Sequence, residues 1–492
     1  MYMKRGILFL AICFLGVASA NAQYLFHRVY GGNGYDTGAE VIELSDTTYL
    51  VAGTSGSYES GMSSQILLLR TDQGGHAQWT KTYGGQFADV AESMVEDVDG
   101  NFLIAGFSET MENSYQGYAL KVDVDGDTLW TRKYGGTEWD FFHQALPLSD
   151  GGFALLGQTY SFGNGEGDVW LVRIDADGDT LWTKTYGGTN DDEGRAISFT
   201  STGGFYLAGN TRSFGAGGQD FYMIKTDAQG DTIWTRTTGG SEDEICYGSC
   251  TTSQGDLITV GGSRSNSPDE YDFMRHKVNS DGDSIKSVIE DGSTDEFWTD
   301  VVENPDDQTL MLVGWVNDSD HGMTDFRFMR VSLNITYNGL AASRGTPLND
   351  RMFDIKTTAD GGFIMVGVTT GWLERLDEVY LYKMGPNGEY VDPELGVEEV
   401  IIGNQSYAVR FAPNPVTEDG QFLVDGFDEM LKSYNGPFAL DVYDRLGRKV
   451  ATSTVNSGKT AIDLTRLSAG IHYYRFVSEQ TVLATGKLLK TN

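Results

Sequence analysis

The chain has 492 residues, and its 70 acidic side chains outnumber its 35 basic ones, which gives a formal net charge of −35 at neutral pH. Binding to nucleic acid or to an anionic membrane needs clustered positive charge, so this balance argues against both kinds of partner. Hydrophobic residues make up 40% of the chain, enough for a packed core, and 63 glycines against 9 prolines favour many short strands joined by tight turns.

The N-terminus has the features of a secretory signal peptide. Lys4 and Arg5 precede an apolar run at 6–20, and Ala20-Asn21-Ala22 offers a small-x-small cleavage site before Gln23. The run is shorter than the roughly 18 residues that a membrane-spanning helix needs. We therefore predict that residues 1–22 are removed. No later segment is apolar and long enough to cross a membrane.

A repeat of about 52 residues fills positions 23–389. Its clearest marker is an aromatic strand that ends in two glycines, at 79–85, 130–136, 182–188 and 234–240. The closing glycines lie at 32, 85, 136, 188, 240, 292 and 345, so their spacings are 53, 51, 52, 52, 52 and 53 residues. Such a period is typical of solenoids, propellers and arrays.

Each period contains four expected strands, which is typical of a propeller blade. In one copy we expect strands at 194–200, 204–209, 220–226 and 232–238. The seventh period supplies only 350–358, 362–369 and 379–384, whereas an extra strand at 24–30 opens the mature chain. A ring resolves this mismatch, because the first strand can complete the last blade and cover two exposed edges. We predict an all-β fold with a seven-bladed β-propeller closed by its N-terminal strand.

Two blocks of the repeat, at 150–157 (DGGFALLG) and 168–182 (DVWLVRIDADGDTLW), resemble the extracellular glycine-rich propeller repeats of the delta-60 and YVTN type. The resemblance covers roughly residues 24–390. It implies the fold but no particular ligand, since propellers carry many unrelated functions.

The last part of the chain departs from the repeat. Residues 390–406 are interpreted as a linker strand, and residues 407–492 alternate strands and turns as in a small Ig-like β-sandwich. Four motifs follow in order: a Pro-Asn-Pro entry, a V-x-D-x-x-G-R hairpin, an L-x-x-L-x-x-G strand and a basic end. They contain Pro413, Asn414, Pro415, Asp444, Gly447, Gly470 and Lys490.

These motifs resemble the type A C-terminal sorting domain of the type IX secretion system. The resemblance implies that the type IX secretion machinery is a partner. It also implies that the protein crosses the inner membrane by its signal peptide and the outer membrane by this domain. We therefore expect a secreted protein or one displayed on the outer cell surface.

Two cysteines, Cys246 and Cys250, remain after the signal peptide. They lie four residues apart in one predicted strand, which at about 3.3 Å per residue separates their Cα atoms by roughly 13 Å. A disulfide needs Cα atoms within about 7 Å, so both thiols are expected to be unpaired.

An acidic residue recurs shortly after each closing glycine, namely Asp36, Asp89, Asp140, Asp192, Glu244, Glu296 and Asp350. These carboxylates could form a collar at one mouth of the channel that holds a cation such as calcium or a basic ligand. Alternatively, each carboxylate accepts backbone N–H bonds and fixes its own crossover loop. Repetition in every blade favours the structural role, because binding sites usually break symmetry.

A second acidic motif, Asp-x-Asp-Gly-Asp, occurs at 123–127 and 175–179, with a variant at 279–283. It resembles the start of a calcium loop, but the distal glutamate of such a loop is absent. Asp-Gly between two alternating strands is also a strong hairpin signal, so we predict hairpin turns here.

No catalytic set or cofactor site is predicted. The six histidines are scattered, and the chain has no H-E-x-x-H, G-x-S-x-G or Walker-type motif. The tryptophan of each repeat strand is expected in the core rather than stacked on a sugar.

The segments between the second and third strands differ between copies, at 58–64, 111–116, 162–167, 214–218, 266–270, 318–323 and 371–376. We therefore predict a binding or adhesion protein that uses these loops to hold an extracellular glycan or protein. The alternative is an extracellular hydrolase or lyase that acts on polysaccharide. The only loop with a mild catalytic character contains Trp372, Glu374 and Arg375.

Overall fold

The computed structural model describes residues 25–389 apart from 33, 58–62, 112–113, 318–322, 346–348 and 371–376. In the C-terminal part it describes 398–490 apart from 403–404, 413–418, 425–426, 428–436, 444–447, 468–469 and 479–480. The predicted signal peptide lies outside these ranges. Within them, no helix is both long and apolar enough to cross a membrane.

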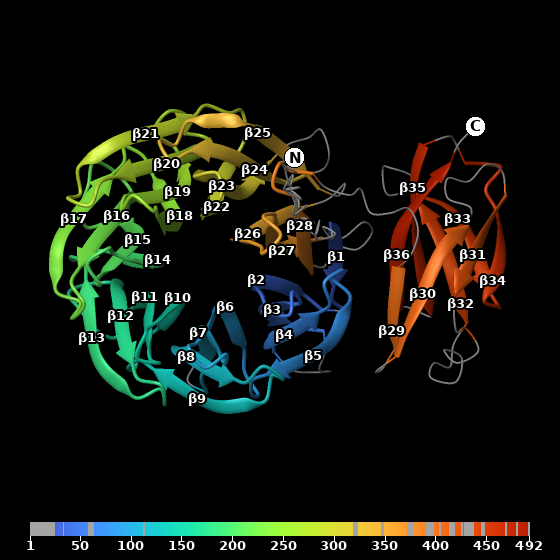
Figure 1. Cartoon of the computed structure of the whole chain (residues 1–492), viewed down its shortest axis with the longest axis horizontal. Coiled ribbons are helices and arrows are strands. Elements are labelled where there is room, and N and C mark those ends of the chain that lie inside the picture. Colours follow the sequence, from blue (N-terminus) through green and yellow to red (C-terminus); the bar gives the residue numbers. More distant parts are fainter. Residues whose placement is uncertain are drawn as a thin grey trace, which may run out of the picture.

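The repeat folds into seven four-stranded antiparallel sheets that follow one another around a ring (Figure 1). Blade 1 contains β2 (Asp36–Glu43), β3 (Tyr49–Ser55), β4 (Gln65–Thr71) and β5 (Ala77–Tyr83). Blade 2 contains β6 (Asp89–Glu96), β7 (Phe102–Glu109), β8 (Tyr115–Val122) and β9 (Thr128–Tyr134). Blade 3 contains β10 (Asp140–Pro147), β11 (Phe153–Thr159), β12 (Asp168–Ile174) and β13 (Thr180–Tyr186). Blade 4 contains β14 (Asp192–Phe199), β15 (Phe205–Thr211), β16 (Asp220–Thr226) and β17 (Thr232–Thr238).

The remaining blades follow the same order from the centre of the ring outward. Blade 5 contains β18 (Glu244–Thr251), β19 (Leu257–Ser263), β20 (Asp272–Val278) and β21 (Ser284–Glu290). Blade 6 contains β22 (Glu296–Asn304), β23 (Thr309–Val316), β24 (Asp325–Ser332) and β25 (Tyr337–Arg344). Blade 7 contains β26 (Asp350–Thr357), β27 (Phe363–Thr369), β28 (Glu378–Met384) and the first strand of the chain, β1 (Phe26–Tyr30).

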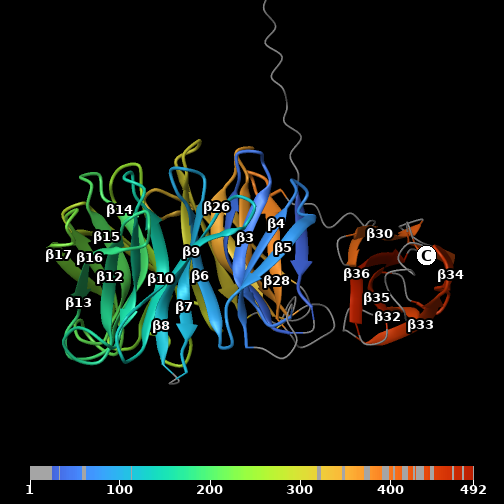
Figure 2. The same ribbon diagram turned by 90° about the horizontal axis from the view of Figure 1, so that it is seen from below.

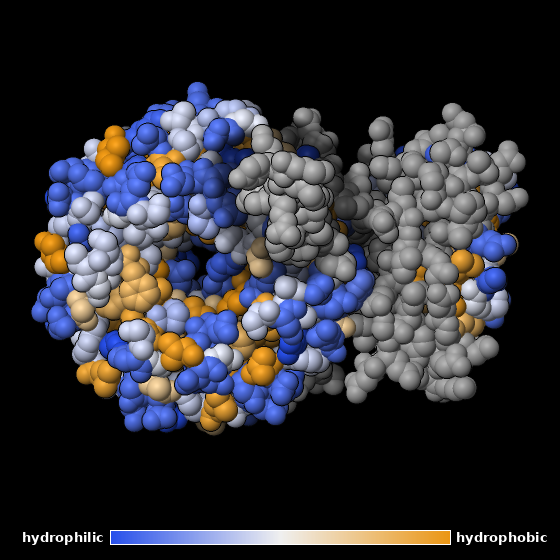
Figure 3. Space-filling view, in the orientation of Figure 1, coloured by the Kyte–Doolittle hydropathy of each residue, from blue (hydrophilic) through white to orange (hydrophobic). Residues whose placement is uncertain are grey.

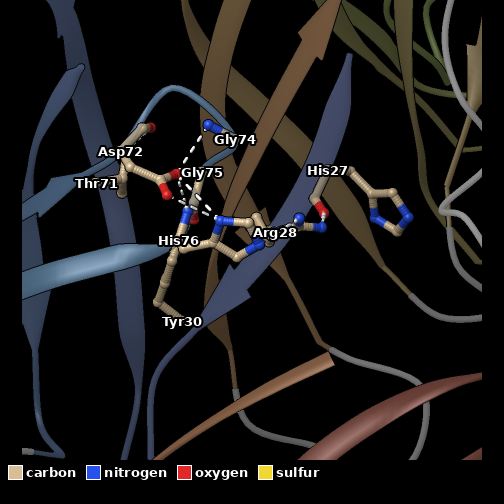
Figure 4. Close-up of polar contacts among 8 residues, drawn as sticks. All are labelled: His27, Arg28, Tyr30, Thr71, Asp72, Gly74, Gly75 and His76. Atoms are coloured by element: carbon tan, nitrogen blue, oxygen red, sulfur yellow. Dashed lines mark hydrogen bonds and ion pairs between the residues drawn. The ribbon is translucent and has the colours of Figure 1, made fainter. Parts of the chain in front are cut away.

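The predicted seven-bladed propeller, closed by its N-terminal strand, is confirmed. β1 pairs antiparallel with β28, from Phe26 opposite Lys383 to Tyr30 opposite Val379. The hydroxyl of Tyr30 also donates to the carbonyl of Gly75 in the β4–β5 turn of blade 1, close to His76 (Figure 4). The first strand therefore acts as the fourth strand of blade 7 and also contacts the next blade.

The same contact recurs between other blades, which shows that the closure copies the ordinary blade interface. Tyr83 donates to the Gly126 carbonyl at 2.5 Å, and Tyr134 donates to the Gly178 carbonyl at 2.7 Å. In the close-up, Arg28 of β1 adds a contact of 3.1 Å to Nε2 of His76 (Figure 4).

Hydrophobic cores fill the spaces between neighbouring blades. One of them joins Leu103 and Ala105 of blade 2 to Phe142, Phe153 and Trp170 of blade 3, all nearly fully buried. Hydrogen bonds cross the same interfaces near the channel. The carboxylate of Glu40 accepts the backbone N–H of Met94 at 2.9 Å, and that of Asp354 accepts the N–H of Val41 at 3.0 Å across the closure.

The tryptophan of the fourth strand has a structural place, as the sequence predicts. Trp130 is partly buried against the core of blades 2 and 3, and its Nε1–H donates to the carbonyl of Ala176 in the next blade at 3.1 Å. Trp234 donates in the same way to Ser280 at 3.2 Å. These side chains therefore hold adjacent blades together.

The strands of each blade run between two faces of the ring (Figure 2). One face carries the crossovers from a fourth strand to the next first strand and the loops between second and third strands. We call it the crossover face, and the opposite end the hairpin face. The first strands line the centre of the ring, which is hollowed in the space-filling view (Figure 3).

The C-terminal part forms a sandwich of two four-stranded sheets. The first sheet contains β29 (Glu398–Ile402), β30 (Gln405–Ala412), β31 (Asp419–Val424) and β34 (Lys459–Asp463). The second contains β33 (Lys449–Val455), β32 (Phe438–Tyr443), β35 (Gly470–Ser478) and β36 (Thr481–Lys490). Phe422 of one sheet packs on Tyr474 and Phe476 of the other, which places the core between them.

The sandwich begins earlier than the predicted boundary at residue 407. β29 lies within the segment interpreted as a linker, and it pairs with β30 from Glu398 opposite Val409 to Ile402 opposite Gln405. The apolar run at 400–402, whose three residues are all β-branched, favours a strand there.

Candidate functional site

Every first strand of the propeller contains a β-bulge at the same place. In β14 the register moves from Gly194 opposite Gly209 to Ala196 opposite Ala208, which leaves Arg195 without a partner in the ladder. The corresponding extra residues are Ala39, Glu92, His143, Tyr247, Thr299 and Phe353. A bulge re-aims a side chain, and here it does so at the channel wall, where seven different residues break the sevenfold symmetry.

A glycine in the second strand makes each bulge possible. A Cβ at Gly157 would overlap the backbone carbonyl of Phe141, and a Cβ at Gly209 would overlap that of Glu193. The glycine five residues into the second strand, which recurs in the other blades, is therefore needed for close backbone approach.

Four charged side chains meet on the channel wall of blades 2 to 4, and we call them the channel cluster: Glu92, His143, Glu193 and Arg195. Nε2 of His143 lies 3.2 Å from Oε1 of Glu193, and Nδ1 lies 3.7 Å from Oε2 of Glu92. Nη2 of Arg195 lies 2.8 Å from Oε1 of Glu193. The amide of Asn210 donates to the other oxygen of Glu193 at 3.2 Å.

The charges of the channel cluster stabilise one another. Burial alone would raise the pKa of Glu193, but Arg195 and His143 outweigh it and lower that pKa to about 2. Burial and Arg195 oppose protonation of His143, yet the carboxylates of Glu193 and Glu92 raise its pKa above the ordinary value. The two carboxylates thus favour the charged form of the imidazole that lies between them.

A small cavity of about 190 Å³ opens beside the channel cluster on the crossover face. Glu193 belongs to both, because it also lines the cavity together with Gln158, Tyr160, Asp191, Asn210, Arg212 and Gln219. These side chains come from the ends of β11 and β15, the start of β14, and the adjoining loops. Burial and the nearby carboxylate of Asp191 raise the pKa of Tyr160 to about 12, so its phenol stays protonated.

Tyr160 of the cavity wall is the first of five aromatic side chains in mutual contact, and we call them the aromatic rim: Phe107, Tyr115, Trp139, Phe141 and Tyr160. Their ring centroids lie between 5.1 and 6.4 Å apart from one neighbour to the next. The Trp139 side chain is 50% exposed and Tyr160 is 37% exposed. Phe141 also stacks on the imidazole of His143, so the rim continues into the channel cluster.

A second cavity of about 470 Å³ lies on the hairpin face, below the first strands of blades 4 and 5. Hydroxyl side chains dominate its lining, among them Ser198, Thr251 and Ser253, and Phe199 contributes an exposed ring. It holds none of the charged groups described above.

The predicted collar residues lie where each fourth strand crosses to the next first strand. Asp36, Asp89, Asp140, Asp192, Glu244 and Asp350 are buried, and Glu296 is half-buried. Asp192 shows their contacts: it accepts the N–H of Gly188 at 2.7 Å and the hydroxyl of Thr211. These hydrogen bonds are the ones expected from the structural role. Among the described residues no three His, Cys, Asp or Glu side chains converge as metal ligands. Calcium binding by the collar stays the alternative hypothesis.

A second set of buried carboxylates was not predicted from the sequence. The third strands of blades 3 to 6 each begin with a buried aspartate, close to the crossover that follows: Asp168, Asp220, Asp272 and Asp325. Asp168 accepts the N–H of Asn164 at 2.7 Å, and Asp220 that of Ala216 at 3.0 Å. The signal was present as an aspartate before an aromatic or apolar run in blades 3 to 6.

The Asp-x-Asp-Gly-Asp segments form the predicted hairpin turns. In the first, Asp123 accepts the N–H groups of Asp125 and Asp127 at 3.0 and 2.8 Å. Lys81 of the preceding blade lies 2.7 Å from Asp127.

The two cysteines are unpaired, as predicted, and burial raises the pKa of Cys246 to about 12.

Two of the predicted binding loops, those of blades 3 and 4, are alike. Phe162 and Phe214 both donate their N–H to the threonine that ends the second strand. The loop with Trp372, Glu374 and Arg375 lies outside the described residues. The blades also differ on their first strands, where the bulge residue is of a different type in each of the seven copies.

The sorting motif is seen in part. Gly470 begins β35 and lies opposite Lys490 at the end of β36, and the Lys490 side chain is 7% exposed. Pro413, Asn414, Pro415, Asp444 and Gly447 lie outside the described residues.

Comparison with known families identifies the C-terminal part. Residues 411–491 match the secretion-system C-terminal sorting domain. The protein therefore combines a seven-bladed β-propeller with a C-terminal sorting domain of the type IX secretion system. It is secreted or displayed on the cell surface by that route, as the resemblance implied.

Part of the chain is also similar to a curated protein. The regulatory protein FlaEY of Caulobacter vibrioides is 28% identical over 238 residues, which cover 42% of this chain and 24% of that protein. The match thus spans about a quarter of the relative's length.

Solved structures with a similar architecture include Sqt1 from Chaetomium thermophilum, with 11% identity and a TM-score of 0.44 over 78% of this chain and 96% of that one. The polysaccharide lyase Uly1 has 10% identity and a TM-score of 0.45 over 71% and 90% of the two chains. Structural similarity at this level gives no information about a ligand.

Proposed function

We propose that the protein is an extracellular binding protein, exported by type IX secretion, whose crossover face captures a glycan or protein ligand in adhesion. The main observation that supports this proposal is the cavity on that face. Tyr160 of its polar lining contacts the half-exposed ring of Trp139, so one small area offers both hydrogen bonds and an aromatic surface. Ligand sites are typically concave, with a few convergent polar groups.

A hydrolase or lyase that acts on polysaccharide is the second candidate function. The channel cluster favours it to a degree, since a histidine between two carboxylates is a familiar acid–base arrangement. However, the His143 side chain is only 10% exposed, and the pKa of Glu193 is lowered to about 2 rather than tuned toward neutrality. A general acid or base works best with a pKa near the operating pH, so binding remains the preferred function.

The test is capture of the full chain on an array of extracellular polysaccharides and matrix proteins. We expect retention of the wild type on some spots, at least about tenfold weaker retention of Trp139→Ala, and no change for Leu181→Ala. Leu181 is a matched control because it is 56% exposed on the outer strand of blade 3. Spots that are degraded rather than occupied would favour the enzyme. If Trp139→Ala is retained as strongly as the wild type, the crossover-face cavity is not the binding site.

A further inference from the structure

We infer that the crossover-face cavity binds the terminal neutral sugar of a glycan. This inference rests on the proposed binding function and names its ligand class. Size gives the first argument. At about 190 Å³ the cavity is smaller than the roughly 300–1,000 Å³ of sites for drug-sized ligands, so it admits a single small ring rather than a folded chain segment.

The cavity offers both donors and acceptors. The side-chain nitrogen of Gln158 donates to the carbonyl of Asp192 at 3.3 Å, and its Oε1 accepts no bond from a described residue. The oxygen of Gln219 accepts from Arg212 at 2.9 Å, and its Nε2 donates to no described residue. A sugar hydroxyl is at once a donor and an acceptor, so it can bond to both of these amides.

The charges of the cavity oppose an acidic sugar. Arg212 is the only cation that lines it among the described residues, and its guanidinium already contacts Gln219 and lies 3.5 Å from Asp243. Arg195 and His143, which lie behind the wall, are engaged by Glu193. Asp191 and Glu193 therefore face an incoming carboxylate or sulfate with no uncommitted positive charge. The net charge of −35 adds long-range repulsion of polyanions.

The aromatic rim supplies the remaining contact that a sugar needs. Tyr160 lines the cavity, and the Trp139 ring lies 6.4 Å from it at an interplanar angle of 76°. An aromatic face packs on the apolar C–H face of a pyranose while its hydroxyls reach the polar wall. Two inclined rings, one in the cavity wall and one in contact with it, fit a ring-shaped group that enters end-on, which is why we assign the terminal sugar.

A protein partner fits these features less well. A stable protein interface buries about 1,200–2,000 Å² and its centre is poor in charged residues. Here the proposed site is a polar recess with two carboxylates, and a protein surface across it would bury them without a partner.

The experiment titrates the full chain with methyl glycosides of glucose, galactose, mannose and fucose, and with methyl glucuronide and methyl galacturonide. Tryptophan fluorescence and calorimetry report binding. We expect at least one neutral glycoside to bind, and its uronate counterpart to bind at least tenfold more weakly. Trp139→Ala and Gln219→Ala should each weaken binding at least about fivefold. Phe199→Ala, on the hairpin face, should leave glycoside binding unchanged.

Each other outcome overturns the inference. A uronate that binds as well as its neutral counterpart contradicts the neutral-sugar assignment. Absence of binding by every glycoside, together with Trp139-dependent capture of a matrix protein on the array, would leave the proposed binding function intact and refute the sugar. Sugar binding that is unchanged in both Trp139→Ala and Gln219→Ala, with unchanged melting temperatures, would place the ligand elsewhere.

Discussion

Nε2 of His143 on blade 3 lies 3.2 Å from Oε1 of Glu193 on blade 4, so an ion pair joins two blades at the wall of the ligand cavity. The same carboxylate contacts Arg195 and Asn210 and lines the cavity. The pair therefore links the stability of the ring to the shape of the site.

Replacement of His143 by Gln should change the pH dependence of stability. The folded-state pKa of His143 is raised, so its ion pair stabilises the fold fully below about pH 6.5. This contribution is lost as the pH rises through the folded-state pKa. We expect His143→Gln to cost about 1–3 kcal/mol at pH 6 and less at pH 9, measured by urea unfolding. An equal cost at both pH values would contradict the ion pair.

His276 provides a contrasting histidine. Burial lowers its pKa to about 4, so the folded state holds it neutral while the unfolded chain takes up a proton near pH 6.5. Its effect should therefore appear on the acid side, as stability lost between about pH 6.5 and 4. For a His276→Gln variant, the free energy of unfolding, measured by urea unfolding, should depend less on pH in that range. Above that range its slope against pH should equal that of the wild type.

Substitution of Gly157 by Ala should disturb the bulge that carries His143. The new methyl group would overlap the carbonyl of Phe141, so the strand must shift. We expect a loss of about 1–3 kcal/mol in the free energy of unfolding, together with weaker ligand binding. Gly85→Ala is the matched control, because no atom lies within 4 Å of its added Cβ. Its cost should stay within about 0.5 kcal/mol, and equal costs would argue against the bulge as the cause.

Loss of the closing strand should destabilise the whole ring. Phe26 of β1 is 5% exposed and packs with Tyr49, Leu67 and Leu381 between blades 7 and 1. Truncation of a buried phenylalanine costs about 3–5 kcal/mol, so Phe26→Ala should lower the unfolding midpoint strongly. Leu181→Ala, on an exposed outer strand, should leave the unfolding midpoint unchanged. A Phe26→Ala protein as stable as the wild type would show that β1 does not hold the ring closed.

The acidic residue at each crossover is expected to act through hydrogen bonds rather than through calcium. Asp192→Ala removes the acceptor of the Gly188 N–H and should cost about 1–3 kcal/mol. Thermal melts of both proteins in calcium and in chelator check this. A melting temperature that rises with calcium only in the wild type would instead support the cation collar.

The blades could be predicted closely because their signals are local. The bounds expected for β16 and β17, 220–226 and 232–238, are those observed, since alternation and turn residues lie within each hairpin. The missing fourth strand of blade 7 also followed from the repeat arithmetic, and the pairing of β1 with β28 agrees with it.

The candidate site could not be predicted in the same way. His143 and Glu193 are 50 residues apart and meet only because the ring places neighbouring first strands side by side. The bulge that presents His143 adds one residue to a strand and leaves no mark of its own in the pattern of apolar residues. Alignment of the seven copies could have found it, because the third residue after each acidic crossover position differs in every blade.

The most direct test of the account is hydrogen exchange of the full chain, measured by mass spectrometry with and without a bound neutral glycoside. We predict slower exchange in peptides that cover 158–160, 191–195 and 210–219, which line the crossover-face cavity. Exchange should not change in peptides that cover 198–201 and 249–255 on the hairpin face. Protection confined to the hairpin face would contradict the assignment of the ligand site.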